Sequence, residues 1–191
     1  DSEQWSEGAK LESFERRFAR AGRNYEGARR VLGLLAAARE PLPAATVATV
    51  LGMGEPEVKA VHKALPDFLR SRVGKLAFDH FSMTEWLTRE TEDGFARAGD
   101  YAVDLVAAQA ALRAWALREV EQGLAHRSSY LLRHLPSHLA SDYERRHVCG
   151  LLMLGRFEWL QARLDQAGVD ALIADALALE GVPGQPLLVA L

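Results

Sequence analysis

His80 carries the side chain in this sequence that is best placed to do chemistry. Before it, Lys75 to Phe78 alternate as a strand does, and a helical pattern begins near Ser82. A histidine where a strand ends and a helix begins projects from a rigid corner. It can donate a hydrogen bond to a phosphate oxygen, and a nearby anion would favour its charged form. We expect the flanking Phe78 and Phe81 to lie in the core. The alternative is a histidine that is satisfied by a backbone carbonyl.

A second pair of histidines has the spacing of metal ligands. His134 and His138 are four residues apart, so both could reach one ion from a helical face, and His147 and Cys149 follow them. Pro136 lies between the pair and would distort the helix, and the Glu of an H-E-x-x-H motif is absent. We therefore expect no metal site and interpret these histidines as capping and packing groups.

A third group of side chains could contact DNA. Its members are basic and lie on an expected helix and on the hairpin that follows it: Lys59, His62, Lys63, Arg70, Arg72 and Lys75. The same helix begins with Glu55 and Glu57, and these carboxylates would face the phosphates of a DNA groove. We expect no nucleic-acid partner and keep DNA binding as the alternative function.

Composition and missing motifs exclude several other classes. The chain has 23 basic and 26 acidic residues and a net charge of −3, so no overall charge favours nucleic acid. No G-x-x-x-x-G-K-[ST] loop, G-x-S-x-G elbow or paired-cysteine site occurs, so we expect the chain itself to be no enzyme and to hold no cofactor. A single cysteine favours a reducing, cytoplasmic location. No apolar run approaches the roughly 20 residues of a membrane-spanning helix, so we expect no membrane partner.

The first part of the chain predicts helices that could position these side chains. Leu11, Phe14 and Phe18 share one face of a leading helix within 1–23. The start lacks an initiator methionine and a signal peptide, which suggests an excised fragment. Asn24 can cap a second helix that stops before Pro41.

A helix-turn-helix and a hairpin follow. Pro43 suits the first position of a short helix and Gly52 a left-handed stop. Gly54-Glu-Pro-Glu begins the next helix, which turns Val58, Val61 and Leu65 inward. Two short strands then run about Gly74. The order of these elements predicts a winged helix-turn-helix domain at 24–92, with the small β-hairpin as its wing.

The rest of the chain is predicted to be helical, so the fold is mainly α. Asp100 should cap a long helix at 101–122 whose Val103, Val106 and Ala110 face neighbours, together with Trp115 or Leu117. Four shorter helices are expected over Ser129 to Leu139, Glu144 to Leu154, Arg156 to Ala167 and Asp170 to Leu179. They predict an α-helical bundle or solenoid-like array at 93–180. Residues 181–191 have the composition of a linker or of the start of a next domain.

Three segments resemble STAND signalling ATPases, the NACHT and NB-ARC proteins. Phe78-Asp-His-Phe-Ser-Met-Thr-Glu-Trp-Leu87 resembles their F-x-H-x-S-F-x-E-W/F-L signature near the end of the winged-helix domain, with Met83 in place of the usual Phe. Val31-Leu-Gly-Leu-Leu-Ala-Ala-Ala-Arg-Glu-Pro-Leu42 resembles the phrase that opens that domain and continues here to Gly52. Tyr130-Leu-Leu-Arg-His-Leu-Pro-Ser-His-Leu139 is similar to the Y-x-x-x-H-L-P-x-H-L segment of many bacterial members. The resemblance covers about residues 25 to 179.

The resemblance implies a role for His80. In that family the winged helix folds against the nucleotide-binding domain, and the histidine of this motif contacts the β-phosphate of ADP. His80 would then be an ADP sensor in a longer parent protein that binds ADP or ATP with Mg²⁺. The implied partners are the nucleotide-binding domain and a C-terminal sensor domain of the same parent chain, with oligomerisation on activation. This chain would be the regulatory segment that couples nucleotide state to the sensor.

Overall fold

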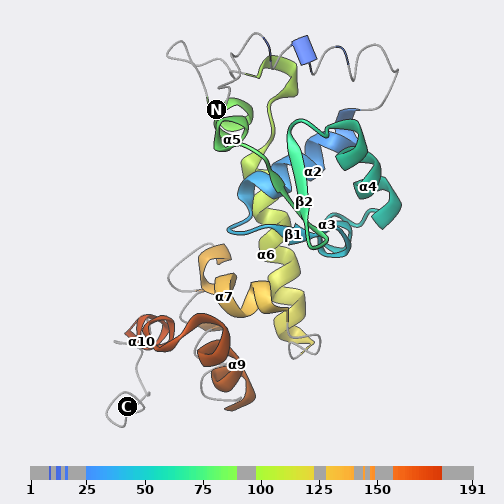
Figure 1. Cartoon of the computed structure of the whole chain (residues 1–191). Helices are drawn as coiled ribbons and strands as arrows, with labels where there is room; N and C mark the ends of the chain where they lie inside the picture. Colours follow the sequence, from blue (N-terminus) through green and yellow to red (C-terminus); the bar gives the residue numbers. More distant parts are fainter. Residues whose placement is uncertain are drawn as a thin grey trace. The chain divides into compact units, whose positions relative to one another are not determined.

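The protein is mainly helical, with one small three-stranded antiparallel sheet (Figure 1). The computed structural model describes residues 25–89, 98–122, 128–139 and 157–177, together with the single positions 9, 12, 13, 16, 144, 147 and 148. Two compact units can be distinguished, one ending at Leu112 and the other beginning at Arg113. The domain boundaries expected at 23/24, 92/93 and 180/181 lie outside the described residues.

The first helix of this unit with described bounds is α2 (Tyr25–Ala37), the second helix that the sequence predicts. The side chains of Val31, Leu32 and Leu34 in this helix are fully buried. In the leading segment 1–23 the four described positions are helical, and the expected cap at Asn24 lies outside the described residues.

The two helices that the sequence predicts around Gly52 are α3 (Ala44–Leu51) and α4 (Glu55–Ala64). Gly52 adopts the expected left-handed conformation with φ 62°, which ends α3. The expectation for Pro43 is wrong: it precedes the helix, at φ −58° and ψ 143°, and belongs to strand β1 (Leu42–Pro43). The physical reason is that Leu42 is fully buried when its backbone pairs with the hairpin, so two residues join the sheet before the helix begins.

The expected hairpin is formed by β2 (Leu69–Arg72) and β3 (Lys75–Phe78), and β1 adds to its other side to give the strand order β1-β3-β2. Its two turn residues, Val73 and Gly74, both have positive φ values of 51° and 74°. This is the type I′ geometry that suits a two-residue hairpin. Helices α2, α3 and α4 contact one another, and α2 also packs on β3 (Figure 1).

Helix α5 (Phe81–Thr88) follows β3 directly and buries Met83, Trp86 and Leu87. The prediction that Phe81 is a core residue is wrong, because its side chain is 73% exposed. The three buried side chains share one helical face, and Phe81 lies about 200° around the helix from Met83. The helical period therefore turns Phe81 toward solvent.

The long helix also begins later than expected. After the short helix η1 (Gly99–Tyr101), α6 spans Leu105–Glu121. The cap is Asp104 and not Asp100, because the Asp104 carboxylate accepts the backbone N–H of Ala107 at 2.9 Å. Ala108, Leu112, Trp115 and Ala116 are buried on one side of this helix, whereas Val106 and Ala110 are exposed, contrary to expectation.

The second unit contains α7 (Ser129–His138), α9 (Phe157–Ala167) and α10 (Val169–Leu177). These helices lie where the sequence predicts them, within one residue at each start. Helix α9 packs against both α7 and α10. Of the predicted helix from Glu144 to Leu154, only positions 144, 147 and 148 are described, and all three are helical. Within the described ranges, no helix has both the length and the apolar character that crossing a membrane demands.

Candidate functional site

His80 lies at a corner whose backbone is fixed on both sides. Before it, the N–H of Asp79 bonds to the carbonyl of Phe68 at 2.9 Å, which closes the last rung of the hairpin. After it, the N–H of Met83 bonds to the carbonyl of His80 at 3.1 Å, so His80 is the N-cap residue of α5. Its φ of −128° and ψ of 136° are extended values, which allow the chain to leave the strand and enter the helix without strain.

The imidazole of His80 is exposed and makes no capping hydrogen bond to α5. Its neighbour Phe81 is also exposed, so the corner presents a hydrogen-bonding ring beside an apolar ring. Imidazole can donate to an anionic oxygen, and an aromatic ring can pack against a partner surface. The geometry suits recognition of a group brought by another domain or molecule.

The hairpin gathers three of the basic residues that the sequence suggests as DNA contacts. The strand register places Arg70 opposite Ala77 and Arg72 opposite Lys75. Directly opposed residues of an antiparallel pair point to the same face, so Arg70, Arg72 and Lys75 share one face of the hairpin. Both arginines are exposed, and the Nζ of Lys75 lies 4.0 Å from a carboxylate oxygen of Glu40.

The basic residues of α4 are placed less favourably for an anionic ligand. Lys59 lies on the exposed side, 2.6 Å from the carboxylate of Glu55. Glu57 accepts the backbone N–H of Gly54 at 2.8 Å, which is the glutamate half of a capping box. The acidic side chains at the start of α4 thus have local roles in helix stability. His62 is half-buried and Lys63 is exposed.

A cavity of about 350 Å³ lies in the first unit between α2, α3 and α6, and the sequence gives no sign of it. Arg29 and Arg30 line it, but their guanidinium groups bond to the carbonyls of Asp100 and Leu51, respectively. Glu26 and Asp104 line it as well, so positive and negative side chains balance. This balance favours no particular charge of ligand.

Tyr130 and the two histidines of the Y-x-x-x-H-L-P-x-H-L segment form a packed cluster in α7. The Tyr130 hydroxyl and the His138 Nε2 are 2.7 Å apart, and both side chains are buried. The ring of His134 lies 5.1 Å from that of Tyr130, centroid to centroid. Across the part of the chain that the structure describes, no group of three or more His, Cys, Asp or Glu side chains could hold a metal ion, and Cys149 lies outside that part.

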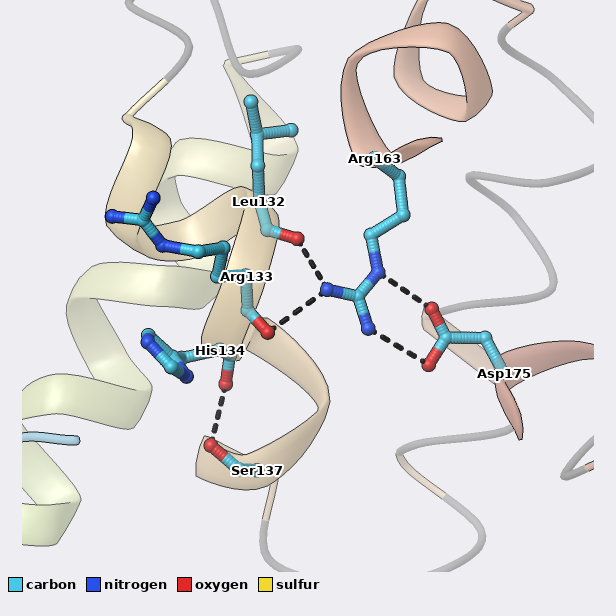
Figure 2. A network of polar contacts seen from close by, with 6 residues as sticks. All are labelled: Leu132, Arg133, His134, Ser137, Arg163 and Asp175. Atoms are coloured by element: carbon cyan, nitrogen blue, oxygen red, sulfur yellow. Dashed lines mark hydrogen bonds and ion pairs between the residues drawn. The ribbon is translucent and has the colours of Figure 1, made fainter. Parts of the chain in front are cut away.

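The second unit contains a buried polar network that no pattern in the sequence predicts. Arg163 on α9 is only 4% exposed and forms a two-pronged pair with Asp175 on α10, at 2.8 and 3.2 Å. Its Nη1 also donates to the carbonyls of Leu132 and Arg133 on α7, at 2.5 and 2.8 Å (Figure 2). The only available signal was a charged pair in otherwise helical segments, which is more often an exposed pair.

Comparison of the chain with protein-family models, with curated proteins and with solved structures finds no match.

Proposed function

We propose that this chain is the regulatory winged-helix and helical region of a STAND-type signal-transducing ATPase. In this proposal α2 to α5, within 24–92, form the winged helix, with the β2–β3 hairpin as its wing. The second unit belongs to the helical region that leads to a sensor domain. The chain couples the nucleotide state of an ATPase domain to sensing and oligomerisation.

The observation that supports this function best is the placement of His80. Its backbone is held by the hairpin on one side and by α5 on the other, while its side chain is exposed. A ring that senses a phosphate on another domain needs both properties, because a preorganised donor loses little entropy on contact. The exposed Phe81 beside it supplies apolar surface for that domain to cover.

In mechanistic terms His80 would favour one of two arrangements of the parent protein. A hydrogen bond from its ring to the β-phosphate of ADP would stabilise the closed arrangement. Exchange of ADP for ATP, which binds with Mg²⁺, would remove that preference and release the protein toward oligomerisation.

The test uses the full-length protein that carries this chain. His80→Ala should raise signal-independent ATPase activity and oligomerisation, because the closed arrangement loses a contact. The matched control is His147→Ala, which removes another exposed imidazole, at a helical position of the second unit. Basal activity and ligand dependence that are unchanged by His80→Ala would refute the sensor role.

A second test needs only sequence. The coding sequence upstream of Asp1 should contain a G-x-x-x-x-G-K-[ST] loop, whose backbone N–H groups cradle nucleotide phosphates. An upstream coding sequence without such a loop would count against the whole assignment, whatever His80 does.

DNA binding by the winged helix is the second candidate function, and the shared face of Arg70, Arg72 and Lys75 favours it. If the hairpin contacts phosphates, the chain should bind duplex DNA with an affinity that falls as salt is added. In Arg72→Gln the slope of the logarithm of the binding constant against the logarithm of the salt concentration should be smaller by about one. Arg118→Gln, an exposed substitution on α6, is the control. Absence of any retention on DNA at low salt would dismiss this candidate.

A further inference from the structure

Helices α9 and α10 form a hairpin that buries little apolar surface. The buried side chains of α9 are Trp159 and Arg163, and those of α10 are Asp175 and Ala176. Half of this buried set is therefore an ion pair. Five other apolar side chains of the same hairpin are exposed, and Leu160 and Leu172 are half-buried; the exposed ones are Phe157, Leu164, Val169, Ile173 and Leu177. Apolar burial alone gives the hairpin a weak hold on its neighbours.

The polar hold on α7 depends on Pro136. In a helix the carbonyl of residue i−4 accepts the N–H of residue i, and proline has no N–H. Pro136 lies inside α7, so the carbonyl of Leu132 has no helical donor at this position. Arg163 supplies the missing N–H at 2.5 Å and also bonds to the next carbonyl, that of Arg133 (Figure 2).

Asp175 acts as a positioning residue for this contact. Its two carboxylate oxygens accept hydrogen bonds from the Nε and Nη2 of Arg163, which fixes the plane of the guanidinium and aims Nη1 at α7. Arg163 thereby makes four hydrogen bonds across three helices. A lysine could not reproduce this planar fork.

The hydrogen bonds of a buried charged contact of this kind form together or not at all. It adds little net stability compared with an apolar contact of similar size, because both ions lose their hydration. Loss of one member is nevertheless costly, since the other remains buried and unpaired. When the hairpin separates from α7, water reaches the arginine, the aspartate and the carbonyls together.

We propose that the α9–α10 hairpin is a releasable element of the second unit, and that Arg163 specifies its docked state on α7. Release breaks the two bonds from Arg163 to α7, exposes Trp159 and leaves the first unit intact. The hairpin thus has a docked and a released state, and the docked state requires the side chain of Arg163. This inference does not depend on the proposed ATPase function.

Hydrogen exchange on the unmodified 191-residue chain tests the release directly. The amides of α9 and α10 should open together, with protection clearly lower than that of α7, as is typical of a separate cooperative unit. One common protection level for α7, α9 and α10 would overturn the proposal, because the hairpin would then open only with the rest of the unit.

Substitutions test the role of Arg163. Arg163→Met keeps most of the side-chain volume and should raise the opening of α9 and α10 on the order of 10²-fold to 10³-fold, with the protection of α2 to α4 unchanged. As the control, Lys59→Met removes a cation from the exposed pair with Glu55 and should change the opening of α9 and α10 by less than about twofold. Arg163→Lys should lie between the wild type and Arg163→Met.

Two results with Arg163→Met would contradict this role. Unchanged protection of α9 and α10 would show that the ion pair does not hold the hairpin, and an equal loss of protection in α7 would show that no separate element exists. If Arg163→Met does not fold, the unmodified chain and Asp175→Asn still decide, because Asp175→Asn keeps the arginine and one acceptor oxygen.

Discussion

The hydroxyl of Tyr130 and the Nε2 of His138 are 2.7 Å apart, and their rings stack at 5.5 Å between centroids with an angle of 21° between the planes. The two residues belong to the same helix and are both buried. The Nε2 atom of His138, which the sequence suggests as a possible metal ligand, is therefore hydrogen-bonded to the hydroxyl of Tyr130.

Tyr130→Phe keeps the stacked ring and removes this hydrogen bond. We expect the free energy of unfolding of the second unit to fall by about 1–2 kcal/mol, because the buried nitrogen of His138 loses its hydroxyl partner. Urea unfolding should measure this loss. In a double-mutant cycle with His138→Phe, the double variant should lose about 1 kcal/mol less stability than the sum of the losses of the two single variants. Strictly additive losses would mean that the two side chains do not interact.

Tyr25 should make the stability of the first unit depend on alkaline pH. Its hydroxyl donates to the carbonyl of Tyr101 at 2.7 Å, and burial raises the pKa of Tyr25 above its ordinary value, against a smaller opposing effect of Arg29. Below pH of about 10 the phenol is protonated in both the folded and the unfolded chain, so it contributes fully to the free energy of unfolding. Above that pH the unfolded chain releases the proton and the folded chain keeps it, so stability falls, by up to about 1.4 kcal/mol per pH unit.

The measurement for Tyr25 compares unfolding of the wild type and Tyr25→Phe between pH 7 and pH 11. At pH 7 the variant should be less stable by about 1 kcal/mol, because it lacks the hydrogen bond. The difference should shrink above pH of about 10, since only the wild type carries this titration. A stability difference between the two proteins that stays constant from pH 7 to pH 11 would exclude Tyr25 as the source of the alkaline loss of stability.

Local patterns in the sequence predict the helices and the hairpin well, because periodicity and turn residues act over a few positions. Gly52 and Gly74 mark their turns correctly for this reason. The helix expected near Ser82 begins one residue earlier, at Phe81, and the helix expected from 101 begins four residues later, at Leu105. Which face of a helix is buried depends on the neighbours that pack against it, so local patterns alone do not predict that Phe81 and Val106 are exposed.

The pairing of Arg163 with Asp175 and with the carbonyl of Leu132 could not be predicted in the same way. It joins positions 12 and 31 residues apart on three helices, and nothing in the local pattern indicates that the arginine is buried. From the sequence alone, Pro136 predicts only a distortion of its helix. Its consequence, a carbonyl that needs a donor from outside the helix, becomes visible once α9 is placed beside α7.

Val73 offers a test of strain at the tip of the hairpin. It is a β-branched residue with φ 51° and a fully exposed side chain, so its conformation is unfavourable and no burial offsets the cost. Val73→Asn creates the Asn-Gly pair that type I′ turns prefer and should raise the free energy of unfolding by about 1 kcal/mol. Val73→Thr retains the branched carbon and should change it by less than about 0.5 kcal/mol. Destabilisation by Val73→Asn would show that the valine makes a contact that matters for folding.

Two glycines of the first unit should respond in opposite directions to the same substitution. Gly33 lies within α2, where a Cβ atom would meet Ala108 and Val103 at 3.6 Å, an ordinary contact distance. Gly33→Ala should therefore stabilise the unit by about 0.5–1 kcal/mol, through helix propensity. Gly52 has open space around it but a φ of 62°, so Gly52→Ala should destabilise by about 1–2 kcal/mol. Urea unfolding of both variants measures the two signs, and stabilisation by Gly52→Ala would contradict the left-handed stop that ends α3.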